Sequence, residues 1–365
     1  MFVPKIKAAG HHVTVFELSN GGRLPSEIGG VKVLPIALDP LGSDMFQGHY
    51  EQSGAHCLIT LVDVWGLNAG VLANANWYPL CPVDTMPAAP AVVENLKRCK
   101  APIAYSRYGE NELRKVGFIP YYIPHAVDPA LWKPGDKFQA RKQIGMPPDV
   151  FFVSFVGVND SVPSRKGIGE LLMAWQLFTE KRKDAVLYMH TSMTGNLGIN
   201  AVGGVKIDVL IKTLGIDPNT VKLVDPYRYR TGIPTLELAT IAQASDVLVL
   251  PTKGEGFGLP LLEFQRAGCP VITTDFAAGA ELCFSGWKIE GEPEWSWQDA
   301  IVMKAGIASI VEALEAAYSE RDNPQRKARA IEGARDYDID TVMSKYAIPV
   351  LNDIAETILS TSKVA

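Results

Sequence analysis

Short apolar runs rich in β-branched residues alternate with helical patterns, such as Lys166–Lys183, along the chain. One series of runs lies at His12–Leu18, Val31–Ile36, His56–Asp63, Pro102–Ser106 and Tyr121–His125, and a second at Phe151–Gly157, Ala185–Thr191, Val221–Asp225, Asp246–Pro251 and Pro270–Asp275. This alternation is typical of parallel sheets that carry helices on both faces. It predicts an α/β protein with two doubly wound, Rossmann-like domains and a ligand cleft between them.

The chain of 365 residues is too long for one ordinary core, which also favours two domains. Residues 125–150 are rich in proline, glycine and charge and are typical of a linker. We therefore predict a first domain at residues 1–147 and a second at 148–340. Residues 341–365 show a helical pattern interrupted at Pro349, and we expect this segment to cross back onto the first domain.

Bulk composition narrows the class of protein. Hydrophobic residues make up 47% and charged residues 21%, as in a globular protein, and the net charge of −5 gives no general attraction to nucleic acid. The five cysteines form no metal spacing, and the sequence shows no signal peptide and no apolar run that could span a bilayer. We expect a cytoplasmic protein and leave a homodimer and peripheral membrane contact open.

The segment GEGFGLPLLEFQRAG, residues 254–268, joins a buried strand to a predicted helix that ends at Gly268. Glycines let backbone N–H groups approach a ligand, and a helix N-terminus favours negative charge, so the turn predicts a phosphate site. Glu263, one turn into the helix, could bind a ribose diol, and Glu255 could reach the group beyond the phosphates. From glycine spacing alone, a tight turn with Glu263 on a solvated face is an equal alternative, and the spacing is not the dinucleotide fingerprint.

The two glutamates, with seven residues between them in EGFGLPLLE, resemble the signature of family 4 glycosyltransferases, which have the GT-B fold. IPHAVDPALWKP and RKGIGELLMAW resemble that family's linker entry and phosphate-binding helix start. The resemblance implies a retaining enzyme that uses a UDP- or GDP-sugar and needs no metal. Glu255 is then expected at the donor sugar and Glu263 at the ribose, with the diphosphate and sugar on the backbone of Gly256, Phe257, Gly258 and Leu259.

Arg165 and Lys166 stand at the start of a predicted helix and could neutralise a diphosphate. Taken alone, the pair is more typical of a solvated helix end, and the resemblance reverses that preference. The family often carries an arginine soon after the glycine of the preceding strand, where this chain has Val158 and Asn159. Asn159 could donate one hydrogen bond there, and Arg165 could supply the charge.

Three further residues are candidates. Tyr227 or Tyr229 could stack on the nucleobase, with ordinary loop aromatics as an equal alternative. Asp84 follows NWYPLCPV, where the family often presents a histidine to the sugars, and it is a catalytic candidate. No clustered metal ligands follow a strand, so no metal is expected.

Family members open with a strand, a glycine-rich loop and a helix, whereas this sequence opens with MFVPKIKAAG. We interpret Lys5–Ala9 as the end of that helix and His12–Leu18 as the second strand, so the first domain lacks its opening strand and glycine loop. The predicted function is transfer of a hexosyl group from a nucleotide sugar to an acceptor hydroxyl, the acceptor being a glycan, a lipid or another hydroxyl compound. The alternatives are a sugar-nucleotide epimerase of the same fold and a nucleotide-sugar-binding remnant without turnover.

Overall fold

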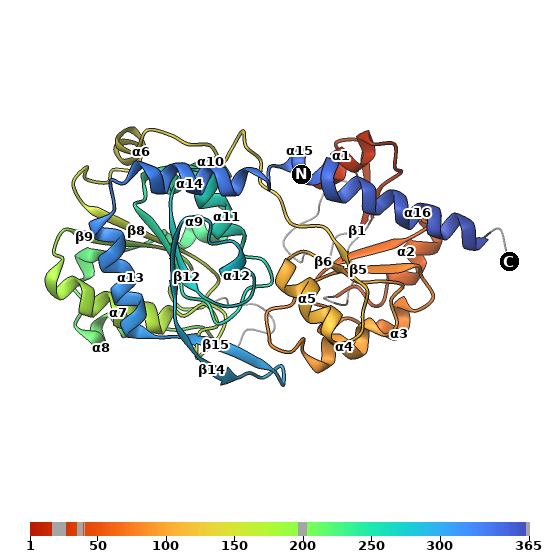
Figure 1. Cartoon of the computed structure of the whole chain (residues 1–365), viewed down its shortest axis with the longest axis horizontal. Coiled ribbons are helices and arrows are strands. Elements are labelled where there is room, and N and C mark those ends of the chain that lie inside the picture. Colours follow the sequence, from red (N-terminus) through yellow and green to blue (C-terminus); the bar gives the residue numbers. More distant parts are fainter. Residues whose placement is uncertain (17–26, 35–38, 40, 196–202, 363–365) are drawn as a thin grey trace. The chain divides into compact units, whose positions relative to one another are not determined.

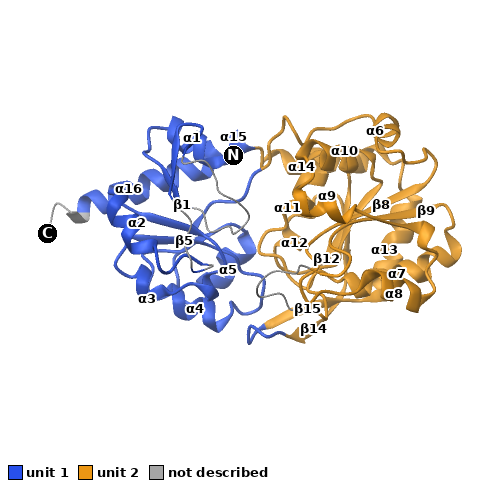
Figure 2. Ribbon diagram, turned by 180° about the vertical axis from the view of Figure 1, so that it is seen from behind, with its two compact units in different colours: residues 1–126, 296–300, 339–365 blue, residues 127–295, 301–338 orange. Residues whose placement is uncertain are grey.

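The computed structural model describes residues 1–16, 27–34, 39, 41–195 and 203–362 and divides the chain into two compact units (Figures 1 and 2). Unit 1 comprises Met1–Ala126, Ser296–Ala300 and Ile339–Ala365, and unit 2 comprises Val127–Trp295 and Ile301–Asp338. Residues 17–18 and 35–36 of the predicted strands lie outside the described residues.

Unit 1 has a parallel sheet in the order β4-β5-β6-β7 and a smaller sheet in the order β1-β3-β2. Helix α1 precedes β1, which confirms the predicted helix-to-strand order at the start of the sequence. The described elements are α1 Phe2–Ala8, β1 Thr14–Phe16, β2 Glu27–Ile28, β3 Val31–Leu34, α2 Phe46–Ser53, β4 Leu58–Leu61, η1 Val64–Gly66, α3 Ala69–Leu72, β5 Trp77–Cys81, α4 Pro90–Leu96, β6 Ile103–Ala104, α5 Arg107–Lys115, β7 Tyr121–Tyr122, α15 Ile339–Val342, the π-helical turn Met343–Ala347 and α16 Ile348–Ser362.

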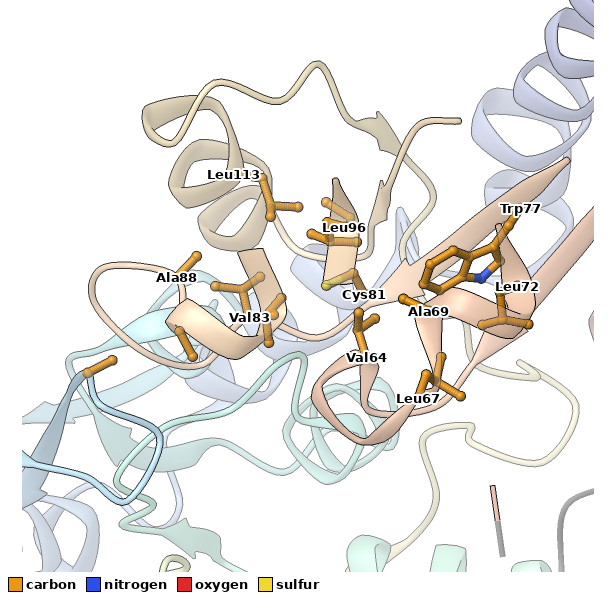
Figure 3. Packing of buried hydrophobic residues seen from close by; sticks show 14 of the residues in the cluster. Val64, Leu67, Ala69, Leu72, Trp77, Cys81, Val83, Ala88, Leu96 and Leu113 are labelled. Atoms are coloured by element: carbon orange, nitrogen blue, oxygen red, sulfur yellow. The ribbon is translucent and has the colours of Figure 1, made fainter. Parts of the chain in front are cut away.

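Alternating residues of β5 point into two separate apolar clusters. Trp77 and Cys81 pack against α3, α4 and α5, where Leu72, Leu96 and Leu113 fill the interior (Figure 3). Tyr78 points the other way, into a cluster formed with the C-terminal helices. Both faces of this sheet are therefore covered.

The predicted interruption at Pro349 corresponds to a π-helical turn, Met343–Ala347, directly before α16. A proline within a helical segment lacks an N–H donor and crowds the preceding turn, and a π-turn is one way to accommodate it. The helical path therefore continues beyond Pro349 and packs through Ile354 and Ile358 into the core of unit 1.

Unit 2 has a parallel sheet in the order β10-β9-β8-β11-β12-β13 and an antiparallel hairpin, β14–β15. Its described elements are α6 Lys137–Gln143, β8 Phe151–Val156, α7 Ile168–Lys181, β9 Ala185–His190, α8 Ile207–Leu214, η2 Pro218–Thr220, β10 Val221–Leu223, α9 Pro226–Thr231, α10 Thr235–Ala244, β11 Val247–Leu250, α11 Leu259–Arg266, β12 Val271–Thr274, α12 Ala277–Glu281, β13 Gly286–Ile289, β14 Gly291–Trp295, β15 Ile301–Ala305, α13 Ile307–Ser319 and α14 Pro324–Arg335.

Helices cover both faces of the unit 2 sheet, as the alternation of strands and helices predicts. Phe151 packs on Phe178 of α7 and Tyr318 of α13, whereas the next residue, Phe152, packs with α6 and α10. The chain leaves β8 toward β9 and β10 on one side and continues from β11 toward β12 and β13 on the other. β8 and β11 are thus neighbours at the switch point, where such sheets bind ligands beyond their carboxyl ends.

Candidate functional site

The loops that follow β8 and β11 are joined by hydrogen bonds at the switch point of the unit 2 sheet. The N–H of Lys253 donates to the carbonyl of Arg165 over 2.8 Å, and the hydroxyl of Thr252 donates to the same oxygen over 3.3 Å. This link brings the basic segment at the start of α7 onto the glycine turn before α11.

Lys166 and Glu255 form an ion pair through Lys166 Nζ and Glu255 Oε1. Both side chains are largely buried, with exposed fractions of 12% and 9%. Burial alone would raise the pKa of Glu255, but the charges of Lys166 and Arg165 outweigh it and hold that pKa below its usual value. Glu255 is therefore ionised at neutral pH and neutralised by a lysine.

The two glycines that precede α7 and α11 both have positive φ. At Gly167 φ is +68°, and a Cβ there would lie 2.1 Å from the carbonyl oxygen of Pro251, so the loops can approach each other only because this residue is glycine. Gly258 has φ +98° and begins α11 without a side-chain cap. Within the described part of the chain, the backbone N–H groups of Gly256, Gly258 and Leu259 donate no hydrogen bond. Such groups at a helix start are suited to an anion.

Glu263 is partly buried on α11 and has no hydrogen-bond or ion-pair partner for its carboxyl among the residues described. Burial raises the pKa of Glu263 to about 7. The two glutamates of the motif therefore differ sharply in environment, because Glu255 faces two cations and Glu263 has no cationic partner among the described residues.

The two other residues predicted near the phosphates have different surroundings. Asn159 is buried, its Nδ2 donates to the carbonyls of Ser192 and Val205 over 2.9 and 2.8 Å, and its Oδ1 accepts from the N–H of Val205 over 2.8 Å. Both N–H groups of its amide are thus used within the protein. Arg165 is partly exposed, and its guanidinium lies 3.9 Å from the carboxylate of Asp160.

The two tyrosines of α9 differ in exposure. Tyr227 is 75% exposed. Tyr229 is partly buried and its ring meets His190 edge-on, with 5.7 Å between the ring centroids. Burial is the main cause that raises the pKa of Tyr229 and lowers that of His190, so both groups are neutral at pH 7. Of the two, Tyr229 has the more defined position.

Asp84 lies in unit 1, partly buried in the segment after β5, whereas Lys166, Glu255 and Glu263 lie in unit 2. It raises the pKa values of the nearby Cys81 thiol and Tyr108 hydroxyl, as secondary contributions to effects dominated by burial.

Lys253, which the sequence did not single out, is a further buried cation of the glycine turn. It is 5% exposed and forms an ion pair with Glu294 of β14 over 2.5 Å. Its position directly before GEGFG could have drawn attention to this lysine, but its partner is 41 residues away in sequence and is not predictable from the motif. Among the described residues no group of three or more His, Cys, Asp or Glu side chains could hold a metal ion.

A surface hollow of about 540 Å³ in unit 2 is lined by Arg182, Tyr318 and Arg321, among others. Arg182 follows the last residue of α7, so the hollow lies at the opposite end of that 14-residue helix from Lys166, about 20 Å away. Both arginines are paired there, with Glu315 and Asp184. The hollow is therefore separate from the glycine turn.

Residues 148–319, which contain this arrangement, match the family described as Glycosyl transferases group 1. The chain is related to the group 1 glycosyltransferases. The D-inositol 3-phosphate glycosyltransferase of Stackebrandtia nassauensis is 27% identical over 313 residues, which are 78% of this chain and 66% of that protein. The chain spans less than two thirds of the length of the curated relatives it matches. The resemblance to family 4 glycosyltransferases that the motifs indicated is confirmed.

Two solved structures define the fold of this glycosyltransferase relative. Sucrose-phosphate synthase from Thermosynechococcus elongatus superposes with a TM-score of 0.72 at 17% identity and covers 98% of this chain and 91% of its own. Anabaena Alr3699/HepE in complex with UDP-glucose gives a TM-score of 0.61 at 17% identity over 91% and 87% of the two chains. The predicted GT-B fold with two Rossmann-like domains is thereby confirmed. No helix in the described ranges has the length and apolar character needed to cross a bilayer.

Proposed function

We propose that the protein is a retaining glycosyltransferase that moves a hexosyl group from a UDP- or GDP-sugar to an acceptor hydroxyl. One observation supports the proposal most strongly. Lys166, Glu255 and the glycine turn lie together at the switch point of the unit 2 sheet, within the residues that match a glycosyltransferase family. A cation, a buried carboxylate and free backbone N–H groups are the groups that a nucleotide diphosphate-sugar requires.

Each residue is assigned a role from its surroundings. Lys166 and the N–H groups before α11 neutralise the diphosphate, which gains negative charge as it leaves. Glu255 stays ionised and faces the donor sugar, where positive charge develops. Glu263 has no partner among the described residues and accepts hydrogen bonds from the ribose hydroxyls. Tyr229 is the stronger candidate for the nucleobase because it is held by His190.

The remaining candidates take supporting places. Arg165 adds positive charge near the phosphates, and its effect on the pKa of Glu255 supports that role. Asn159, whose amide is occupied by backbone groups, positions the loop after β9 instead of binding the donor directly. We propose that unit 1 binds the acceptor and contributes Asp84 as a catalytic group. The nucleotide sugar is the donor substrate, and the chemistry needs no metal.

The test is an assay with UDP-glucose and GDP-mannose as donors and D-inositol 3-phosphate among the acceptors, because the curated relatives bear that substrate in their names. Release of nucleotide diphosphate only with an acceptor, and an α-linked product from an α-linked donor by NMR, supports retaining transfer. Conversion of the donor without an acceptor would indicate an epimerase, and binding without any product would indicate a remnant. Lys166→Ala is the negative control.

A further inference from the structure

Three of the seven tryptophans are exposed. Two of them are near neighbours in sequence, and the third contacts one of these two. Trp295 and Trp297, on the β14–β15 hairpin, are 68% and 70% exposed, and Trp65, on η1, is 43% exposed. Trp77, Trp132 and Trp175 are by contrast buried in the core. Exposed indoles that contribute nothing to a core are typical of binding surfaces.

Trp65 and Trp297 form a T-shaped pair, with ring centroids 5.1 Å apart and planes at 83°. In this geometry the edge of one ring meets the face of the other, so the ring that contributes its edge keeps both of its faces free of its partner. The pair belongs to unit 1, which includes the hairpin tip Ser296–Ala300 (Figure 2).

The hairpin tip is held firmly. Ser296 N–H and its hydroxyl both donate to the carbonyl of Ala300 over 2.9 Å, and Asp299 N–H donates to the carbonyl of Ser296 over 3.1 Å. Ala300 is fully buried in the apolar cluster of unit 1. Trp297 therefore projects from a fixed turn, which lowers the entropy lost when a ligand stacks on it.

The segment that carries Trp65 is also held in a fixed position. Its neighbours Val64 and Leu67 are buried in the same cluster (Figure 3), and Asn95 Nδ2 donates to their carbonyls over 2.8 and 3.1 Å. Both indoles are thus preorganised without being covered.

Both strands of the hairpin are attached to the glycine turn through Lys253. Its ammonium pairs with Glu294 of β14, and its carbonyl accepts from the N–H of Met303 of β15 over 2.9 Å. Trp297 follows Glu294 by three residues, so the chain keeps their Cα atoms within about 11 Å. Trp297 therefore follows directly on the strand whose Glu294 pairs with Lys253, next to the turn that carries Glu255.

The charges around Trp65 and Trp297 favour a neutral sugar over an anionic lipid surface as the ligand. Glu292, Glu294 and Asp299 outnumber Lys304 in the hairpin, which disfavours an anionic lipid surface. The ring of a neutral pyranose has one apolar C–H face that stacks on indole, and its hydroxyls can donate to carboxylates and amides such as Asp299 and Gln298.

From these observations we infer that Trp65 and Trp297 form a stacking platform for a neutral sugar ring of the acceptor. The inference rests on the proposed function and names the acceptor class as carbohydrate. The platform binds and positions the acceptor and takes no part in bond making.

Saturation-transfer NMR on the full chain with UDP present tests the platform, with methyl α-D-glucopyranoside, methyl α-D-mannopyranoside and methyl β-D-galactopyranoside as probes. At least one glycoside should receive saturation, strongest at the C–H groups of one ring face. Trp297→Ala and Trp65→Ala should each weaken that binding about tenfold, the scale of losing one stacked ring. Trp297→Tyr should retain most of it, and Trp295→Ala is the matched control, because Trp295 is equally exposed on the same hairpin and should leave binding unchanged.

Calorimetry with UDP-glucose measures donor binding, on which the proposed function depends, separately from glycoside binding, on which the platform depends. Variants that still bind UDP-glucose are folded, so a loss of glycoside binding in them is specific. Glycoside signals that are absent from the wild type, or equal in all four variants, would overturn the platform even if UDP-glucose binds. A change from dimer to monomer by sedimentation in Trp297→Ala would also overturn it, since a second copy would then occupy the indoles.

Discussion

Replacement of Glu263 by glutamine should change how the stability of the protein depends on pH. The Glu263 carboxyl lies partly buried with no partner in the part of the chain that the structure describes, and its pKa is raised from 4.5 to about 7. In the unfolded chain the group ionises near 4.5, so between pH 4.5 and 7 the native state binds more protons than the unfolded state. Stability from this group therefore falls as pH rises through that interval and is constant above it.

The size of the effect follows from the pKa difference. A tenfold change in an acid constant corresponds to about 1.4 kcal/mol, so ionised Glu263 costs the native state about 3 kcal/mol at pH 8 and almost nothing at pH 4.5. Glutamine has nearly the same shape and cannot ionise. The free energy of unfolding of Glu263→Gln minus that of the wild type should thus increase by up to about 3 kcal/mol between pH 4.5 and pH 8.

Urea unfolding of the two proteins at several pH values gives this difference directly, because the other titrating groups are the same in both and cancel. Glu312→Gln, an exposed carboxylate of α13 in the same unit, is the matched control and should run parallel to the wild type. Parallel curves for Glu263→Gln as well would show that the Glu263 carboxyl is solvated in the native state.

The same carboxyl should report on the ribose. Two hydrogen bonds from ribose hydroxyls stabilise the ionised form, so UDP-glucose binding near pH 7 should release protons from Glu263. Calorimetry in phosphate and Tris buffers, which differ in ionisation enthalpy, measures that release. UDP-glucose is the suitable ligand because it has no group of its own that titrates there. Glu263→Gln should bind it more weakly and release no protons.

Three further changes test the site and its support. Lys166→Ala should weaken UDP about tenfold to a hundredfold in calorimetry and leave uridine little affected, and an equal loss for both would assign the lysine to folding alone. Gly167→Ala should destabilise the fold by at least about 1–3 kcal/mol in urea, because its φ is +68° and the new methyl meets the carbonyl of Pro251; unchanged stability would show that the two loops can separate. Asp246→Asn should cost about 3–5 kcal/mol, since it leaves buried Arg141 and the neighbouring Lys137 without their carboxylate; a loss below about 1 kcal/mol would show that those cations find water.

Periodicity predicted the strands of unit 2 well because they are continuous apolar runs buried on both sides. The prediction at Phe151–Gly157, for example, is β8 Phe151–Val156. β5, Trp77–Cys81, was missed because Pro79 lies within it and argues against a central strand, yet it pairs with both β4 and β6. Trp77 and Cys81, on either side of Pro79, are buried in the apolar cluster of unit 1, and no local pattern shows that packing.

The β14–β15 hairpin was missed for a different reason. Its first strand, Gly291–Trp295, contains Pro293 and two glutamates and shows no apolar alternation. It is held by the Lys253–Glu294 ion pair, the Met303 hydrogen bond and the burial of Ala300, all of which join residues far apart in sequence. Contacts of this kind exist only once the fold has formed.

The motif identified Glu255 and Glu263 as a pair but could not show how they differ. Glu255 is buried against Lys166 and Arg165, which keep it ionised, while Glu263 is isolated and half protonated near pH 7. Two acidic groups with pKa values displaced in opposite directions are suited to two separate tasks. Glu255 already has a cationic partner in Lys166, whereas Glu263 gains its first partner from any donor that arrives. A nucleotide sugar whose diphosphate draws Lys166 away would therefore leave Glu255 with less cationic compensation, next to the sugar, at the same time as Glu263 acquires its first partners. The favourable interaction at Glu263 would then offset part of the cost of uncovering Glu255, which is a physical reason for two carboxylates at this spacing on one helix start.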